Sequence, residues 1–197
     1  MPKDTFYRLK EEKKQRIFEA AVQEFALRKF SEASLNQIVK AAKIPWGSFY
    51  QYFDGKEDLY HYVIQEISRD KWDTLEQAGV EDMEADFFNT IREKIVALFG
   101  LGKHNPDYAQ IVLLQEMDDN EFIRKLREDS TRRWTKIIER DKEHGLIKPE
   151  VDAEVMLDMF YNFVLLNHYR VGLDDEEKYL ATLDKAIKIM REGVSAN

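Results

Sequence analysis

The chain has 197 residues, 44% of them hydrophobic, and a formal net charge of −8. This length allows one large or two small domains with a buried core. The sequence contains no cysteine, which excludes disulfides, thiolate zinc sites and thiol nucleophiles. No apolar run approaches the ~18 residues of a membrane-spanning helix, and the charged N-terminal residues do not form a secretory signal. We therefore expect a cytoplasmic protein without a membrane partner.

Charge is unevenly distributed along the chain. Residues 1–56 carry eight lysines and three arginines against seven acidic residues, a balance of +4, whereas the remaining residues carry −12. The overall acidity argues against a nucleic-acid partner. A basic segment joined to an acidic body nevertheless favours a module that binds an anion. Chance clustering is the alternative for an excess of this size.

Apolar residues recur at helical spacing within the first 56 residues. One stripe consists of Phe18, Ala21, Val22 and Phe25, and a second of Leu35, Ile38, Val39 and Ala42. The sequence of residues 34–37 has the pattern of a capping box, which predicts that Ser34 caps the second helix and that Gln37 reaches back to it. Pro45 suits the first turn of a third helix, and Asp54-Gly55 ends that helix.

Helical periodicity continues through the rest of the chain, so we predict an all-α protein. The expected helices cover residues 56–77, 83–101, 107–117, 120–144, 153–171 and 176–192, with glycine or proline between most of them. The sequence shows no internal repeat, low-complexity tract or long linker. The joint near residue 56 is therefore expected to lie between packed helices and not in a flexible tether.

The three short N-terminal helices have the spacing of a helix-turn-helix unit, whose recognition helix enters the DNA major groove. A turn over residues 42–45 joins the second helix to the third. Phe49 and Phe53 lie one helical turn apart and are expected to face Ile38 and Phe25 in the core. The opposite side then carries the uncharged residues Trp46, Ser48, Tyr50, Gln51 and Tyr52. Such side chains bind phosphates and base edges or pack on thymine methyls, although core packing is the alternative for either tyrosine.

These segments resemble a known family. Residues 17–25, 34–42 and 47–53, followed by Lys56-Glu57-Asp58-Leu59, are similar in order and spacing to the N-terminal domain of TetR-type (TetR/AcrR) bacterial transcriptional regulators. The resemblance implies an all-helical homodimer, with a helix-turn-helix DNA-binding domain at residues 1–55 and a helical ligand-binding and dimerisation domain at residues 56–197. It also implies repression at a palindromic operator in double-stranded DNA, relieved by a small-molecule effector.

The resemblance assigns DNA contacts to individual residues. Ser34 takes the place of a cap residue that touches phosphate, Lys56 that of a helix-start lysine with the same role, and Gly47 that of a small residue that lets the backbone approach DNA. The full expected DNA-binding set is Ser34, Lys43, Trp46, Gly47, Ser48, Tyr50, Gln51, Tyr52 and Lys56. Further phosphate attraction is expected from Arg28, Lys29 and Lys40 around the rim.

Three positions depart from the family pattern. The family often has glycine at the position of Lys29, serine or threonine at that of Pro45, and lysine or arginine at that of Trp46. The loss of a cap and a cation weakens two expected phosphate contacts. Trp46 instead adds a large apolar surface, so the operator sequence does not follow by analogy.

The body is expected to hold an effector pocket and a dimer interface. Residues 155–171 are almost continuously apolar, which predicts a helix buried on most sides. In the resembled family the last two helices form the dimer interface, for which the candidates are Phe160, Val164, Tyr179, Leu183, Ile187 and Met190; the core of a monomeric bundle is the alternative. Candidates for apolar pocket walls with a few polar groups are Phe88, Ile91, Ile95, Phe99, Leu114, Met117, Trp134, Ile138, Tyr161, Asn167 and His168. They indicate a bulky, largely apolar effector, and the acidity of the body favours a neutral or cationic one.

The alternatives to a regulator are a helical enzyme and a protein-interaction module. A helical enzyme lacks support because residues 57–197 show no nucleophile setting, no acid–base pair and no phosphate-binding glycine loop. The four histidines are scattered, so neither a metal nor another cofactor is expected. A helical protein-interaction module that has lost specific DNA binding is supported by Trp46, which replaces the usual cation.

Overall fold

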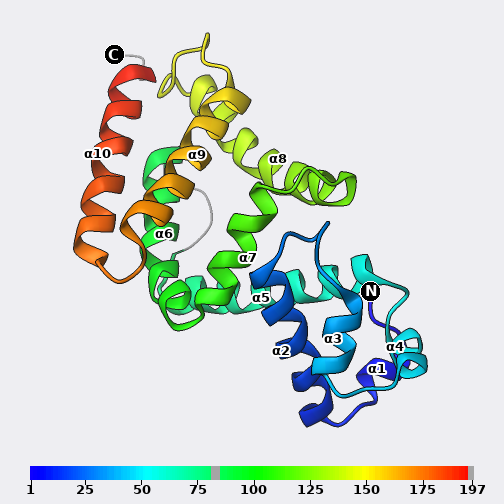
Figure 1. Cartoon of the computed structure of the whole chain (residues 1–197). Coiled ribbons are helices and arrows are strands. Elements are labelled where there is room, and N and C mark those ends of the chain that lie inside the picture. The colour runs from blue at the N-terminus through cyan, green and yellow to red at the C-terminus, as the bar shows by residue number, and fades with distance from the viewer. Residues whose placement is uncertain (81–84, 195–197) are drawn as a thin grey trace. The chain divides into compact units, whose positions relative to one another are not determined.

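The computed structural model describes residues 1–80 and 85–194, except for the side chains of residues 129 and 130 (Figure 1). The described residues form α-helices joined by turns and contain no strand, which confirms the all-α prediction. The chain divides into two compact units, Met1–Trp72 with Asn105–Lys125 and Asp73–His104 with Leu126–Asn197. This division falls inside a helix near residue 72. The expected separation of DNA-binding and ligand-binding functions at residue 55 stays a prediction.

The helices of the first unit are α1 (Asp4–Tyr7), α2 (Glu11–Leu27), α3 (Leu35–Ala41), α4 (Trp46–Tyr52), most of α5 (Lys56–Gln77), α7 (Pro106–Glu116) and the start of α8 (Glu121–Glu143). Within this unit α2 packs against both α3 and α7, and α1 packs against α4. The apolar stripe of α2 is buried at Ile17, Ala21, Val22 and Phe25. The Phe25 ring meets the edge of Tyr60 at a centroid distance of 4.8 Å, which joins α2 to α5.

The N-terminal helix α1 is an element that the sequence pattern did not predict. Phe6 is only 1% exposed, and its ring lies 4.9 Å from that of Phe53 and 5.0 Å from that of Tyr62. The backbone N–H of Lys3 donates to the carbonyl of Tyr52 at 2.8 Å. The first ten residues therefore cover the C-terminal end of α4, where the last carbonyls of a helix lack partners of their own.

The second unit contains α6 (Phe87–His104), the remainder of α8, α9 (Ala153–Val171) and α10 (Glu176–Val194). In this unit α10 packs against α9 and α6, and Figure 1 shows α9 and α10 side by side. Side chains from all four helices share one buried apolar cluster, including Phe87, Ile138, Leu157, Phe160 and Leu183. The second unit thus has a core of its own.

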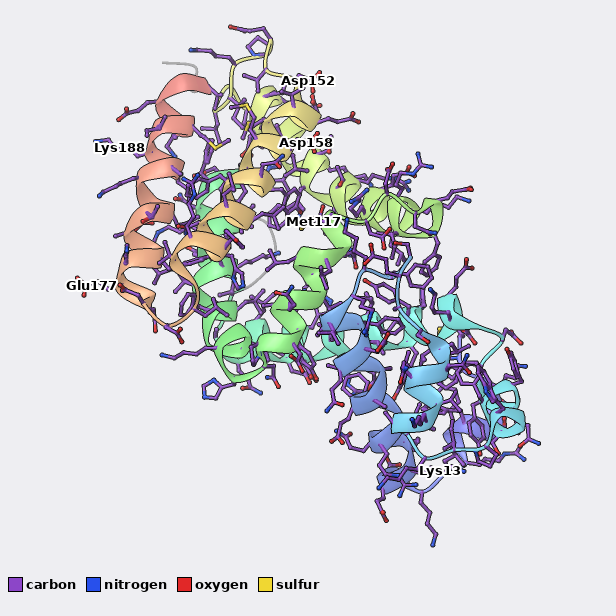
Figure 2. All side chains as sticks on the ribbon, in the orientation of Figure 1. Lys13, Met117, Asp152, Asp158, Glu177 and Lys188 are labelled. Carbon is purple, nitrogen blue, oxygen red and sulfur yellow. The ribbon has the colours of Figure 1, made fainter. Side chains whose placement is uncertain are left out.

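Helix bounds agree with the expected ranges to within a few residues, apart from the start of α6. The expected first residues of that helix, from residue 83, lie outside the described part of the chain, and α6 begins at Phe87. Asp86 precedes it and accepts hydrogen bonds from the N–H groups of Phe88 (3.0 Å) and Asn89 (3.1 Å). Asp152, labelled in Figure 2, caps α9 in the same way through the N–H groups of Glu154 and Val155.

Ser34 does occupy the N-cap of α3, but the capping box is not formed. The Ser34 side chain makes no capping hydrogen bond. Its backbone N–H donates to Oε1 of Glu24 at 2.8 Å. Glu24 is 7% exposed and also accepts from Nη1 of Arg28. A buried carboxylate of α2 therefore holds the start of α3, in place of the reciprocal bonds that the sequence pattern predicts.

The expected dimer residues require a correction. Phe160, Tyr179, Leu183 and Ile187 are at most 7% exposed. Phe160, Leu183 and Ile187 belong to the core cluster of the second unit, and the Tyr179 ring packs against Phe99 of α6, so these four side chains present little surface to a second chain. Val164 and Met190 are partly buried against the same cluster. The exposed apolar residues of these two helices are Val155, Met159, Leu166, Tyr169 and Ile189.

A buried carboxylate, Asp141 of α8, joins three elements of the second unit. It is fully buried. Its Oδ2 accepts from the N–H of Phe87 at 2.6 Å, and its Oδ1 accepts from Nε and Nη2 of Arg140 at 3.0 and 2.7 Å. Arg140 also donates to the carbonyl of Ala85 at 2.7 Å. The start of α6 is thereby fixed to the end of α8.

We expect Asp141→Ala to lower the free energy of unfolding by about 3 kcal/mol, because it leaves the buried N–H of Phe87 without its acceptor and removes the buried carboxylate that pairs with Arg140. Asp158→Ala, at an exposed position of α9 (Figure 2), is the matched control and is expected to change it by less than about 0.5 kcal/mol. Urea denaturation monitored by circular dichroism measures both. Equal stability of the two variants would contradict the structural role of Asp141.

Candidate nucleic-acid interface

A tight turn sets α4 against α3. Ala42 is fully buried, and the N–H of Ile44, itself 7% exposed, donates to the carbonyl of Val39 at 3.3 Å. Lys43 adopts a left-handed conformation with φ of 53°, which is uncommon for a residue with a side chain. The turn therefore buries two apolar side chains and leaves the Lys43 side chain exposed beside the start of α4.

The two sides of α4 differ completely in their surroundings. Phe49 and Phe53 are fully buried, as the helical spacing predicted. Trp46 and Tyr50 are 42% and 53% exposed on the opposite side. Gly47 and Gln51 are also exposed, and Ser48 is half-buried. The exposed side of α4 carries no charged residue, so any attraction for an anion must come from neighbouring elements.

Tyr52 is a correction to the expected DNA-binding set. It is 6% exposed. Its hydroxyl accepts from Nζ of Lys13 at 2.9 Å, and its ring packs against Phe6 at 6.3 Å. Lys13, labelled in Figure 2, also lies over the Tyr52 ring. Tyr52 is covered because α1, which the sequence pattern missed, occupies that side of the helix.

Lys56 is engaged within the protein. Its Nζ donates to the carbonyls of Ala33 (2.9 Å) and Ser31 (3.4 Å) and lies 4.7 Å from the centre of the Phe30 ring. Burial lowers the pKa of this ammonium, against the opposing effect of Asp118 and Glu24. The expected phosphate contact by Lys56 would have to displace these intramolecular acceptors, and the salt dependence of DNA binding tests whether it forms.

The other cationic residues expected near α4 differ in their exposure to solvent. Lys40 and Lys43 are exposed, whereas Arg28 is paired with Glu24 at 2.9 Å and Lys29 is half-buried. Lys3, which the sequence pattern did not single out, donates from Nζ to the carbonyl of Tyr50 at 2.9 Å. The side-chain hydroxyl of Thr5 donates to the carbonyl of Gln51. The N-terminal segment thus brings a further cation to the end of α4.

A second network holds the loop between α2 and α3 from the side of α7. The N–H of Ser31 donates to Oδ2 of Asp118 at 2.8 Å, and Asp118 is 2% exposed. Nearby, the Tyr60 hydroxyl donates to Oε1 of Gln115 at 3.3 Å, and the Phe30 and Phe122 rings lie 5.0 Å apart. The end of α7 therefore contacts the loop that precedes the helix-turn-helix.

The expected effector-pocket residues are distributed over both units, and their role in binding an effector stays a prediction. Leu114 and Met117 belong to the first unit, and Met117, at the end of α7 (Figure 2), is 61% exposed. Phe88 lines a cavity of about 210 Å³, whose other lining residues are Asp86, Asp141, Leu146, Ile147 and Arg191. Ile91, Ile95, Trp134, Ile138 and Tyr161 belong to the core of the second unit or pack against it.

The remaining candidates, Phe99, Asn167 and His168, lie near the contact of α6, α9 and α10. The Phe99 and Tyr179 rings are 5.2 Å apart. Asn167 is 4% exposed, and its Nδ2 donates to the carbonyl of Tyr179 at 3.2 Å while its Oδ1 has no partner. Burial lowers the pKa of His168. An uncompensated buried amide oxygen in this part of the core is compatible with a polar ligand group.

No group of three or more histidine or acidic side chains among the described residues is arranged to hold a metal ion. No helix in residues 1–80 and 85–194 is long and apolar enough to cross a membrane.

An N-terminal helix-turn-helix with an uncharged, exposed recognition side defines a DNA-binding protein of the helix-turn-helix class. Residues 17–63 match the family model "Bacterial regulatory proteins, tetR family". The transcriptional repressor DhaR of a Mycobacterium species is 25% identical over 92% of this chain and 96% of its own.

Solved structures agree. A TetR family transcriptional regulator from Chloroflexus aurantiacus is 26% identical, with a TM-score of 0.74 and 98% of each chain covered. FadR from Bacillus subtilis, solved in complex with stearoyl-CoA, has the same fold at 18% identity, with a TM-score of 0.67 and 91% and 98% covered. The chain is thus similar over nearly its whole length to TetR-type transcriptional regulators, residues 17–63 match the model of that family, and the relatives and solved structures named here are regulators.

The salt dependence of DNA binding distinguishes an exposed lysine from a lysine that is engaged within the protein. Lys40→Ala, at an exposed position, is expected to reduce the slope of log K against log salt by about 0.9 for each phosphate contact removed. Lys56→Ala is expected to leave that slope unchanged and to lower stability by about 1–2 kcal/mol, because two carbonyls lose their donor. Fluorescence anisotropy with a duplex of arbitrary sequence measures the slopes. An equal loss of slope in both variants would place the Lys56 ammonium on phosphate.

Proposed function

We propose that this protein is a dimeric repressor that binds a palindromic operator through α4 and is released from it by a small, largely apolar effector. The observation that carries the proposal is the division of α4 into a fully buried side, Phe49 and Phe53, and an exposed, uncharged side. A surface helix of a protein with 35% charged residues usually exposes charge. Uncharged hydrogen-bonding and aromatic groups are suited to base edges in the major groove.

The distribution of charge along the chain supports DNA binding by the N-terminal region alone. The first 56 residues have a balance of +4, and the exposed Lys40 and Lys43 lie in α3 and in the turn that precedes α4. The rest of the chain has a balance of −12 and would be repelled by phosphate. The protein is therefore expected to touch the duplex only through its N-terminal domains.

A heptad-like stripe of α9 supports dimerisation. Val155, Met159, Leu166 and Tyr169 are all more than half exposed and follow one another at intervals of four, seven and three residues. Such spacing keeps side chains on one side of a helix. The stripe lies on the side of α9 opposite Phe160, which faces the core. We assign the partner chain to this stripe and Ile189 of α10, in place of the buried residues expected from the sequence.

The effector is expected to act by shifting a population between two arrangements. The helix α5 begins beside the DNA-binding elements and continues into the second unit, and Asp118, which follows α7, holds the loop before α3. Either connection transmits a change only if the effector binds the two arrangements with different affinity. The stearoyl-CoA bound by FadR is consistent with a long apolar effector for a protein of this fold.

The function is tested with the full chain and a duplex of the DNA upstream of its own gene. We expect affinity at least about a thousandfold above that for a scrambled duplex, steep salt dependence, and contacts at half-sites about 34–36 Å apart or a multiple. Equal binding to both duplexes at every salt concentration would contradict the proposal and favour a protein-interaction module. An effector that lowers operator affinity must itself bind more weakly, by the same factor, to the operator-bound protein.

The exposed stripe of α9 leads to a separate prediction about dimerisation. Met159→Glu places a charge in the proposed interface, so sedimentation should show a monomer whose operator affinity falls at least tenfold, because one domain alone reads one half-site. Val96→Glu, at an exposed apolar position of α6, is the control and should remain dimeric. A dimeric Met159→Glu variant would show that the interface lies elsewhere.

A further inference from the structure

The side chains of Trp46 and Tyr50 form a stacked pair on the exposed side of α4. Their ring centroids are 5.9 Å apart and their planes are inclined by 15°. The buried Phe49 ring meets both edge-on, at 6.2 Å from Trp46 and 5.3 Å from Tyr50. Because Phe49 is buried in the core, its contacts hold the Trp46 and Tyr50 rings in place. The pair therefore loses little conformational entropy when it binds another molecule.

The fold itself does not require this surface. Trp46 and Tyr50 keep 42% and 53% of their area in water, which is unfavourable for aromatic carbon. Gly47, beside the pair, has an ordinary helical φ, and a Cβ added there would meet nothing within 4 Å. A glycine inside a helix costs about 0.5–1 kcal/mol relative to alanine. Neither packing nor backbone conformation demands it, so the open space beside Gly47 is better explained by the approach of another molecule.

We propose that the Trp46–Tyr50 pair determines specificity for thymine by packing on its C5-methyl group. The C5-methyl is the apolar group that the four standard bases present in the major groove, and it distinguishes thymine from cytosine and uracil. The pair is apolar, uncharged and next to Ser48 and Gln51, which provide hydrogen-bonding groups for neighbouring base edges. This inference rests on the proposed function and names the base that the DNA-binding side of α4 recognises.

The size of the effect follows from the burial of one methyl group. Removing it from water contributes about a fourfold gain in affinity, and two symmetric half-sites give about fifteenfold. The contact with Trp46 and Tyr50 is made through carbon, so it does not depend on the hydrogen-bonding pattern of the base. A methyl group on cytosine at the same step should therefore recover part of the loss.

The test first selects a preferred duplex from a randomised library with the full-length protein. The selected duplex is then resynthesised with deoxyuridine at one symmetric pair of thymines at a time, and with cytosine or 5-methylcytosine there. We expect one thymine pair at which uracil weakens binding about fifteenfold, and at which 5-methylcytosine binds better than cytosine. The Trp46→Ala variant should bind the thymine and uracil duplexes equally. Tyr50→Phe keeps the ring and should retain the ratio of thymine to uracil affinity, whatever its overall affinity for the operator.

Controls separate the possible failures. Leu27→Ala removes an exposed apolar side chain of α2 and should retain the full thymine preference. Circular dichroism melting confirms that Trp46→Ala is folded. Equal affinity for thymine and uracil at every position, or a preference that persists in Trp46→Ala, overturns the inference while leaving the proposed function intact. Failure to enrich any sequence overturns both.

Discussion

The burial of Phe49 and Phe53 is the constraint on which the DNA-binding part of the structure depends. Both rings are fully removed from water, and they stack on one another at a centroid distance of 5.5 Å. Burial of two aromatic side chains is worth several kcal/mol, which far exceeds the cost of exposing Trp46 and Tyr50. The orientation of α4 about its own axis is thereby fixed, and the uncharged side has only one direction in which to face.

Three neighbouring elements hold α4 in that orientation. The turn before it buries Ala42 and Ile44, and the N-terminal segment donates hydrogen bonds to the carbonyls at its end. Lys56 and Asp118 secure the loop between α2 and α3 from the other side. The exposed face of α4 thus belongs to a rigid support, which is what a site that discriminates between bases requires.

Much of the architecture was predictable because it is local. The helical stripes, the turn at residues 42–45 and the opposed faces of α4 all follow from spacing along the chain, and α9 begins and ends where the sequence pattern indicates. The features that the sequence pattern did not predict depend on contacts between residues far apart in the chain. Helix α1 has four residues and one buried side chain, too short for a periodic signal, and without it Tyr52 is assigned to the exposed side. The Lys56 ammonium finds carbonyls of a loop more than twenty residues earlier, which no local pattern reports.

The exposed stripe of α9 that we assign to the dimer interface was also not predictable from periodicity. Residues 155–171 are apolar on most sides, so periodicity states that the helix is buried without stating which side meets α6 and α10 and which meets a partner. The structure places Phe160 in the core and leaves Met159, one residue earlier, 61% exposed. Neighbouring positions on one helix therefore serve the core and the proposed interface.

Chemical protection of DNA tests whether the exposed side of α4 enters the major groove. Dimethyl sulfate methylates guanine N7 in the major groove and adenine N3 in the minor groove. With the full-length protein on its selected duplex, we expect protection of guanine N7 in two patches about 10 base pairs apart, or a multiple, and we expect Trp46→Ala to need about a fifteenfold higher concentration for the same protection. Protection of adenine N3 alone, or major-groove protection unaffected by substitutions in α4, would contradict this placement of α4.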